Sequence, residues 1–156
     1  MADNLETTRN GGSVPQSLNG SSPGTQSVRT VRAFLEAMER GDTDAAVELL
    51  HPDVVWKNTT LPDVRGARRV AGVLRGLERP ALGFAVEVHH IAADGAVVLT
   101  DRTDVLRFGP VAIRFWVMGT FVLREGKIVL WDDHFSWENF LRGTVGGVFR
   151  AVFSRR

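Results

Sequence analysis

Cysteine and tyrosine are both absent from the 156 residues of this chain. Without cysteine, the chain cannot form a disulfide, supply a thiolate nucleophile or bind a metal through sulfur. Without tyrosine, no phenol can serve as an acid, as an oxyanion donor or as a ligand of water. An excess of one charge is missing too, because 19 Lys and Arg face 18 Asp and Glu. This balance predicts no nucleic acid partner.

Long hydrophobic runs are also missing from the sequence. No apolar run approaches the roughly 18 to 20 residues that cross a bilayer. No basic segment followed by an apolar stretch, as in a secretory signal, stands near the N-terminus. We therefore expect no transmembrane segment and a cytoplasmic location. The four histidines lack the spacing of metal ligands, so we expect neither a metal nor another cofactor.

Length and composition favour one globular domain. Hydrophobic residues make up 44% of the chain, which is enough for a core. Residues 1–26 differ from the rest, because they are rich in Gly, Ser, Asn, Thr and Pro and carry only isolated apolar residues. Such a segment cannot bury enough surface to offset its ordering entropy. The sequence predicts a disordered N-terminal tail over 1–26 and a single domain over 27–156.

Hydrophobic periodicity predicts helices first and strands afterwards. The predicted helices are one that begins near Ser27 and ends before Gly41, a short one capped by Asp42 or Thr43, and one over 65–79. The predicted strands cover 53–58, 83–93, 96–108, 111–124 and 127–137. A last stretch, 138–153, reads as helical in pieces. This order predicts an α+β fold with a strongly curved, mixed but mainly antiparallel sheet.

Polar residues interrupt two of the predicted strands. Asp133 alternates with Val129, Trp131 and Phe135, so it shares a strand face with large apolar side chains. Arg102 and Asp104 stand two apart on another strand and also share a face. Both faces of that strand are mixed, so the pattern does not decide which one points inward.

A guanidinium between two carboxylates can split their roles. If Asp133 lies across from Arg102 and Asp104, the arginine lets one carboxyl ionise while repulsion keeps the other protonated. The pair then supplies a base and an acid near neutral pH. The same three residues could also form an ion network that only holds the sheet together. Spacing alone leaves both interpretations open.

Three motifs resemble those of a known family: WKNTTLP over 56–62, DRTDVL over 101–106 and LWDDHF over 130–135. Their order and strand placement are similar to the limonene-1,2-epoxide hydrolase family, within the NTF2-like and SnoaL-like cone fold. The resemblance runs from about Val28 to Phe140. It implies helices packed on the concave face of the sheet around a deep pocket, and a homodimer. It also implies one-step hydrolysis of an epoxide by an enzyme-held water, with no metal and no covalent intermediate.

The resemblance assigns roles to residues of this chain. Asp133 matches the aspartate that deprotonates the water, and Asp104 matches the acid that protonates the epoxide oxygen. Arg102 matches the bridging arginine, and Asn58 matches the asparagine that fixes the water. Trp56 is a departure, because the family has a tyrosine there, and an indole can donate a hydrogen bond but cannot accept one.

The aromatic residues beside these groups complete the predicted site. The residues expected to line the substrate pocket or contact the water are Trp56, Trp131 and Phe135. We expect a hydrophobic epoxide, such as a terpenoid, a lipid or a sterol, to be hydrolysed to a vicinal diol. The alternatives are an enzyme of the polyketide-cyclase or isomerase type and a non-catalytic lipophile-binding protein on the same fold.

Overall fold

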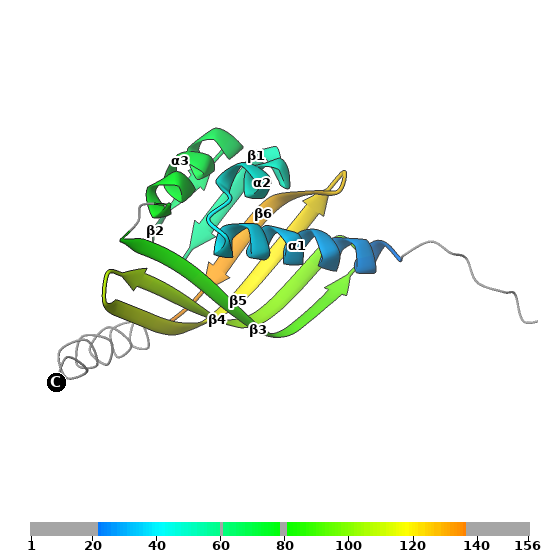
Figure 1. Cartoon of the computed structure of the whole chain (residues 1–156). Helices are drawn as coiled ribbons and strands as arrows, with labels where there is room; N and C mark the ends of the chain where they lie inside the picture. Colours follow the sequence, from blue (N-terminus) through cyan, green and yellow to red (C-terminus); the bar gives the residue numbers. More distant parts are fainter. Residues whose placement is uncertain (1–21, 60, 79–80, 137–156) are drawn as a thin grey trace, which may run out of the picture.

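The computed structural model describes residues 22–59, 61–78 and 81–136. Three helices and one six-stranded sheet make up this α+β fold, as the sequence predicts (Figure 1). The helices are α1 (Pro23–Glu39), α2 (Thr43–Glu48) and α3 (Ala67–Leu77). The strands are β1 (Leu50–Asn58), β2 (Leu61–Arg65), β3 (Leu82–Asp94), β4 (Val97–Phe108), β5 (Val111–Arg124) and β6 (Lys127–His134). Residues 1–21 and the predicted helical pieces over 138–153 lie outside the described residues.

Helix α1 begins inside the range that the sequence analysis assigns to the tail. It starts at Pro23 because Ser22 caps it: the Ser22 hydroxyl accepts a hydrogen bond from the Thr25 backbone N–H at 3.2 Å. Proline at the first helical position loses no hydrogen bond. The helix therefore begins four residues before Ser27. The apolar pattern alone missed this start because the first turn carries no apolar side chain.

The sheet follows the order β2-β1-β6-β5-β4-β3. Strands β3 to β6 form the predicted antiparallel meander, and the first hairpin turns at Gly95 with a φ of 57°. Strand β1 runs parallel to β6, so the sheet is mixed. The short strand β2 was not predicted, because Pro62 and Asp63 disfavour a strand; it forms at the sheet edge, where proline is tolerated.

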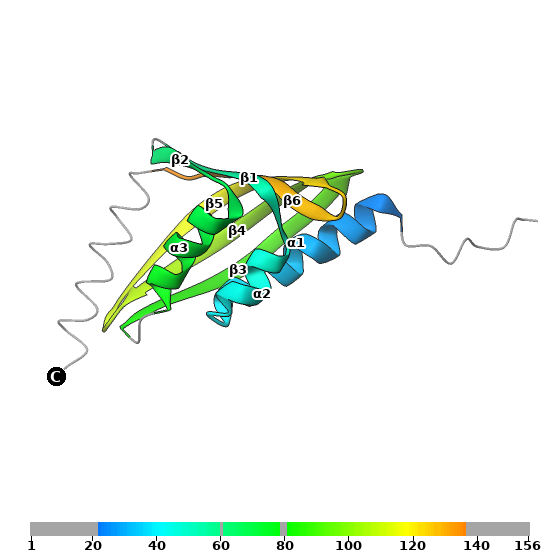
Figure 2. The same ribbon diagram turned by 90° about the horizontal axis from the view of Figure 1, so that it is seen from above.

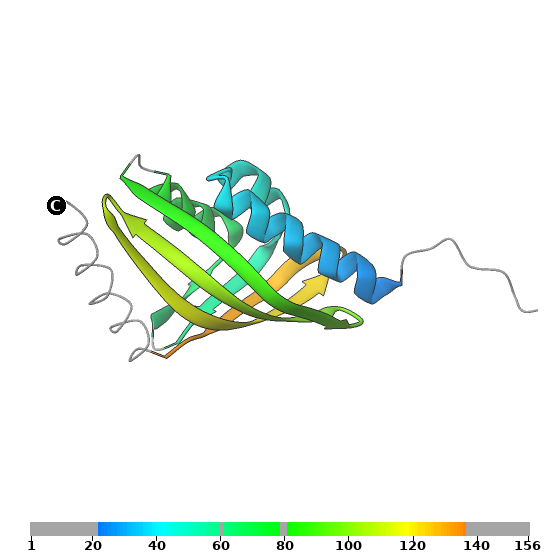
Figure 3. The ribbon, with the colours of Figure 1, turned by 60° about the horizontal axis from the view of Figure 1, so that its bottom comes forward.

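The three helices cover one face of the sheet (Figure 2). The long strands β3, β4 and β5 bend together, which gives the sheet its curl (Figure 3). Helix α1 packs mainly against β3, and α3 packs against both α2 and β1. The core between the layers includes Phe34 and Leu35 from α1 with Phe121 and Trp131 from the sheet. Phe34 meets the Trp131 ring edge-on, with 4.9 Å between ring centroids.

Two β-bulges correct the predicted strand faces. In β6 the pairing with β5 shifts between Ile128 and Leu130, so Val129 is the extra residue. Simple alternation puts Ile128 on the face opposite to Trp131 and Val129 on the same face, but the bulge buries Ile128 with Trp131 and leaves Val129 only half-buried. In β3 the pairing shifts between Val88 and His90, so the two adjacent histidines do not point to opposite faces.

The bulge in β3 brings both histidine rings to the outer face of the sheet. His89 Nε2 lies 2.9 Å from Thr103 Oγ1, and His90 Nδ1 lies 2.9 Å from Asp101 Oδ2. Thr103 and Asp101 share the face of β4 opposite to Arg102. These histidines therefore lie away from the concave side of the sheet.

Candidate active site

Strands β4 and β6 carry four buried polar side chains on the concave face. Thr100, Arg102 and Asp104 alternate along β4 and are 1%, 0% and 5% exposed. Asp133 on β6 is 4% exposed. The face of β4 that the sequence left undecided is therefore the inner one, and its polar residues meet Asp133 inside the fold.

Gly119 on β5 makes room for the Arg102 side chain. It pairs with Thr100 on one side and with Asp133 on the other. A Cβ at this position would meet Arg102 Nη1 and would lie 2.6 Å from Thr100 Oγ1. Neither Gly119 nor Thr100 was predicted from the sequence to have a role in the site. A glycine inside a strand of β-branched and aromatic residues was the signal that could have indicated a close approach.

Arg102 bridges the two aspartates. Its Nε donates to Asp104 Oδ1 at 2.9 Å, and its Nη2 donates to Asp104 Oδ2 at 3.2 Å and to Asp133 Oδ2 at 2.7 Å. Its Nη1 donates to Thr100 Oγ1 at 3.0 Å. The guanidinium is therefore held by three side chains, those of Asp104, Asp133 and Thr100. Because its N–H groups have a rigid planar geometry, it fixes the two carboxyl groups relative to each other.

The site contains one cation and two acidic groups. Burial raises the pKa of Asp133 to about 6, and the opposing effect of Arg102 does not cancel it. Burial also raises the pKa of Asp104 against the effect of the same arginine. Burial by itself would lower the pKa of Arg102, but the two carboxylates raise that pKa above its usual range. The site can therefore give up and take back a proton near neutral pH.

Trp131 fixes one oxygen of Asp133. Its Nε1 donates to Asp133 Oδ2 at 2.7 Å, so this oxygen receives bonds from both Trp131 and Arg102. The other oxygen, Oδ1, is buried and has no hydrogen-bond partner among the described protein atoms. The carboxyl group therefore holds one oxygen in a fixed network and leaves the other able to accept a proton. The sequence predicted Trp131 as a pocket residue but not this hydrogen bond.

The parallel pairing of β1 and β6 brings the other predicted residues to the same place. Asn58 pairs with Asp133, and Trp56 pairs with Trp131. The two indoles stack with ring centroids 4.2 Å apart and an interplanar angle of 8°. All four catalytic residues suggested by the resemblance therefore lie on three strands around one location.

An apolar cavity of about 290 Å³ opens beside these residues. Its polar side chains are Asn58, Asp104 and Asp133, together with the indole of Trp56. The remaining lining side chains are Met38, Leu61, Val73, Leu74, Leu77, Phe84, Leu106, Phe115, Val117, Trp131 and Phe135. The predicted pocket residues therefore line a single cavity together with both carboxyls.

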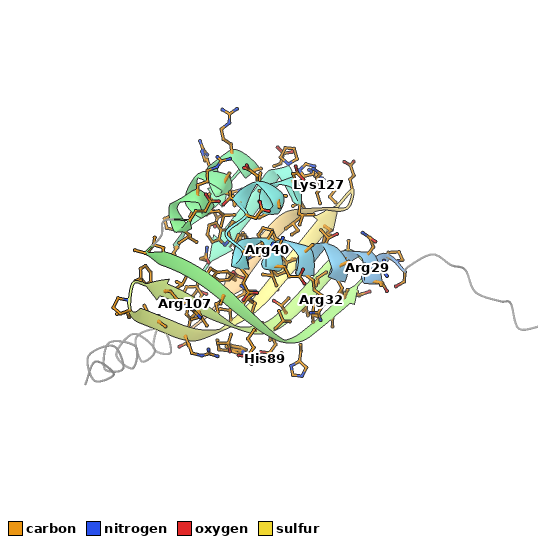
Figure 4. The ribbon with its side chains drawn as sticks, in the orientation of Figure 1. Arg29, Arg32, Arg40, His89, Arg107 and Lys127 are labelled. Atoms are coloured by element: carbon orange, nitrogen blue, oxygen red, sulfur yellow. The ribbon has the colours of Figure 1, made fainter. Side chains whose placement is uncertain are left out.

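A second cavity of similar volume adjoins the first but contains none of the clustered polar groups. It shares Met38, Leu74, Leu77 and Phe84 with the first cavity and is otherwise bordered by residues 39–41, Thr43, Glu78 and the start of β3. The basic side chains labelled in Figure 4, such as Arg40 and Arg107, are all exposed, whereas Arg102 is fully buried. We therefore place the candidate chemistry in the first cavity.

Within residues 22–59, 61–78 and 81–136, no cluster of three or more His, Asp or Glu side chains could hold a metal ion. In the same part of the chain, no helix has the length and apolar character to span a membrane.

Comparisons with known proteins agree with this geometry. The family model described as "Limonene-1,2-epoxide hydrolase catalytic domain" matches residues 25–146. Epoxide hydrolase EphG of Mycobacterium tuberculosis is 41% identical over 122 residues, which cover 78% of this chain and 81% of that protein. A solved structure of an LEH-like epoxide hydrolase from M. tuberculosis superposes with a TM-score of 0.80 at 40% identity. That match covers 84% of this chain and 98% of the other.

More distant structures share the fold alone. One is an NTF2-like protein of unknown function from Cytophaga hutchinsonii, with a TM-score of 0.62 at 14% identity. The match covers 80% of this chain and 99% of that one. The cone architecture implied by the sequence motifs is therefore confirmed.

Proposed function

Because this chain belongs to the limonene-1,2-epoxide hydrolase family and is an epoxide hydrolase, we propose that it opens the epoxide ring in one step, by attack of a water molecule. In this proposal Asp133 is the base and Asp104 is the acid. Arg102 holds the two carboxyls in place, and Asn58 helps to hold the water. The product is a vicinal diol, and no covalent intermediate forms.

The proposed step moves two protons and exchanges two bonds. The water oxygen forms a bond to one ring carbon while the bond between that carbon and the ring oxygen breaks. The water gives a proton to Asp133 Oδ1, and Asp104 gives its proton to the ring oxygen. Asp133 then carries a proton and Asp104 is ionised, so a proton must return to Asp104 before the next cycle. The net reaction consumes one water.

One observation carries this proposal: a fully buried arginine bridges two carboxyls at the wall of an apolar cavity. Both carboxyls have a raised pKa, and Asp133 Oδ1 is left to accept a proton. An ion network with only a structural role would satisfy both oxygens of each carboxylate. Groups placed on opposite sides of a bound ring provide general acid and general base catalysis without a nucleophilic side chain.

The lining of the cavity supports the proposal that the substrate is hydrophobic. Its wall consists mostly of Leu, Val, Met, Phe and Trp side chains, and its polar side chains are few. Such a pocket orients an apolar ligand through a small number of polar contacts. We propose that the substrate is a terpenoid, lipid or sterol epoxide whose ring reaches the carboxyls.

Two neighbouring aspartates allow a matched test of the catalytic residues. The chain is incubated with limonene oxide, a sterol epoxide and a styrene-type epoxide, and diol is measured by chromatography. Asp133→Asn keeps the size and the hydrogen-bond acceptor but removes the base, so its rate should fall by roughly 10²- to 10⁴-fold. Asp132→Asn is the control, because Asp132 belongs to the opposite face of β6 and pairs with His134 at 3.3 Å.

The outcomes separate the proposed function from its alternatives. Equal rates in Asp133→Asn and the unsubstituted protein would contradict the assigned base. Binding of the epoxides without any product would favour a lipophile-binding protein. Rearranged or cyclised products in place of a diol would favour an enzyme of the isomerase or polyketide-cyclase type.

We also propose that the chain forms a homodimer through the outer face of its sheet. Leu99, Trp116 and Met118 stand on this face of β4 and β5 and are 49%, 44% and 41% exposed. Neighbouring large apolar side chains on a surface are typical of an interaction site. A sheet face can pair with its own copy about a two-fold axis, which is the commonest symmetry of soluble oligomers.

A further inference from the structure

Two buried polar atoms beside the cavity have no partner among the described protein atoms: Trp56 Nε1 and Asp133 Oδ1. The first can only donate a hydrogen bond, and the ionised second can only accept one. Leaving a buried polar atom without a partner is unfavourable, because the atom has lost its hydrogen bonds to water. Both residues line the same cavity. A single group that accepts from one atom and donates to the other would satisfy both, and water is the smallest such group.

The strand register places the two atoms on one side of the sheet. Trp56 and Asn58 on β1 pair with Trp131 and Asp133 on β6, so the chain carries Trp-x-Asn beside Trp-x-Asp. The stacked indoles hold each other in orientation. Their N–H groups differ in their partners, because the Trp131 N–H donates a hydrogen bond to Asp133 Oδ2. The Trp56 N–H is not taken by a described residue and is left at the cavity wall.

We infer that Trp56 Nε1 donates a hydrogen bond to the attacking water and thereby sets its orientation. This inference rests on the proposed function of the same site. The water gives one hydrogen to Asp133 Oδ1 and the other to the amide oxygen of Asn58. One lone pair accepts from Trp56, so only the second lone pair is free to attack the ring.

The residue change at position 56 then has a specific chemical consequence. A tyrosine hydroxyl, as the family resemblance implies at this position, can both donate to a water and accept from it. An indole can only donate. With Trp56, both hydrogens of the water must point to Asp133 and Asn58, so a single orientation remains. Trp56 is a positioning residue for the nucleophile in addition to a part of the pocket wall.

Trp56→Phe tests the inference, because it removes the N–H and keeps an aromatic ring against Trp131. We expect kcat to fall by roughly 10- to 100-fold, as for a misplaced reacting group. KM should change by less than about threefold, because the lost contact is to water and not to substrate. The ratio of attack at the two ring carbons, measured with ¹⁸O-labelled water, should also shift. Lys57→Gln, at the next residue of β1 and on the opposite face of that strand, is the control and should leave kcat and this ratio unchanged.

A high-resolution crystal structure of the unsubstituted protein provides an independent measurement. We expect an ordered water within about 3.2 Å of both Trp56 Nε1 and Asp133 Oδ1. An unchanged kcat and attack ratio in Trp56→Phe, or a crystal structure without a water on Trp56 Nε1, would overturn the inference while the proposed function stands. If the unsubstituted protein forms no diol, the proposed function fails and the inference fails with it, whatever water the crystal structure shows.

Discussion

At the scale of single residues, the raised pKa of Asp133 determines how activity depends on pH. The base must be ionised, and burial raises its pKa to about 6. We therefore expect kcat/KM to fall as the pH drops below about 6, because Asp133 then becomes protonated. Well above this pH, the ionisation of Asp133 is complete and no longer changes kcat/KM. Asp132→Asn should leave the midpoint of this decline in place. A decline centred near pH 4, where an ordinary aspartate titrates, would contradict the assignment.

Gly119 provides a second test at the same scale. In Gly119→Ala the new Cβ would meet Arg102 Nη1, so the guanidinium must move away from at least one of its partners. We expect a loss of activity of roughly 100-fold and a loss of unfolding free energy of about 1 to 3 kcal/mol. Rate measurements and chemical denaturation check these values.

Gly72→Ala is the control for that substitution. Gly72 stands in α3 with nothing within 4 Å of its added Cβ, so alanine should stabilise the helix and leave the rate unchanged. Gly119→Ala with unchanged activity would show that Arg102 does not need its observed position.

The sequence predicted individual site residues better than their contacts. The motifs identified Arg102, Asp104 and Asp133, and alternation placed the first two on one face. Neither could show that the guanidinium also binds Thr100, because that contact depends on an empty position in β5, a strand with no polar motif of its own. The spacing of residues within one strand does not show where a neighbouring strand leaves space for a side chain.

At the scale of helices and strands, the residue that caps a helix determines where the helix begins, and a substitution of that residue tests this role. Asp42 caps α2 by accepting a hydrogen bond from the Ala45 backbone N–H at 3.0 Å. Asp42→Ala should lower the free energy of unfolding by about 1 kcal/mol without changing the rate of hydrolysis. Asp44→Ala, which removes an exposed ion pair with Arg75, should cost less. A larger loss for Asp44→Ala would contradict this account of where α2 begins.

The helices and the antiparallel strands were predictable from periodicity and turn residues, but three features were not. Strand β2 forms only because β1 offers a free edge, which no local pattern contains. The parallel pairing of β1 with β6 joins the first and the last of the described strands. The bulge at Val129 reverses the face of Ile128, because one extra residue changes the alternation. All three arise from pairing between strands.

At the scale of the whole molecule, the sheet separates two functions. Its concave face carries the carboxyls and the cavity, and its outer face carries the apolar side chains of the proposed dimer. A charge placed on the outer face should therefore disrupt assembly and leave the site intact. Met118→Glu should convert a dimer to a monomer in sedimentation analysis, because a buried unpaired charge is costly.

Arg29→Glu is the control for the assembly test. Arg29 is an exposed residue of α1, which lies on the helix side of the sheet (Figure 4). This variant should remain a dimer. A monomeric unsubstituted protein, or a Met118→Glu variant that stays dimeric, would contradict the proposed interface.

The central claim is that water attacks the epoxide directly, with Asp133 as its base. A single turnover in ¹⁸O-labelled water, with protein in excess over epoxide, tests this claim most directly. Direct attack predicts that the new hydroxyl of the diol carries ¹⁸O in the first turnover. It also predicts that Asp133→Asn forms diol much more slowly than the unsubstituted protein. A covalent ester on an aspartate would instead deliver unlabelled oxygen from the protein, and that result would contradict the account.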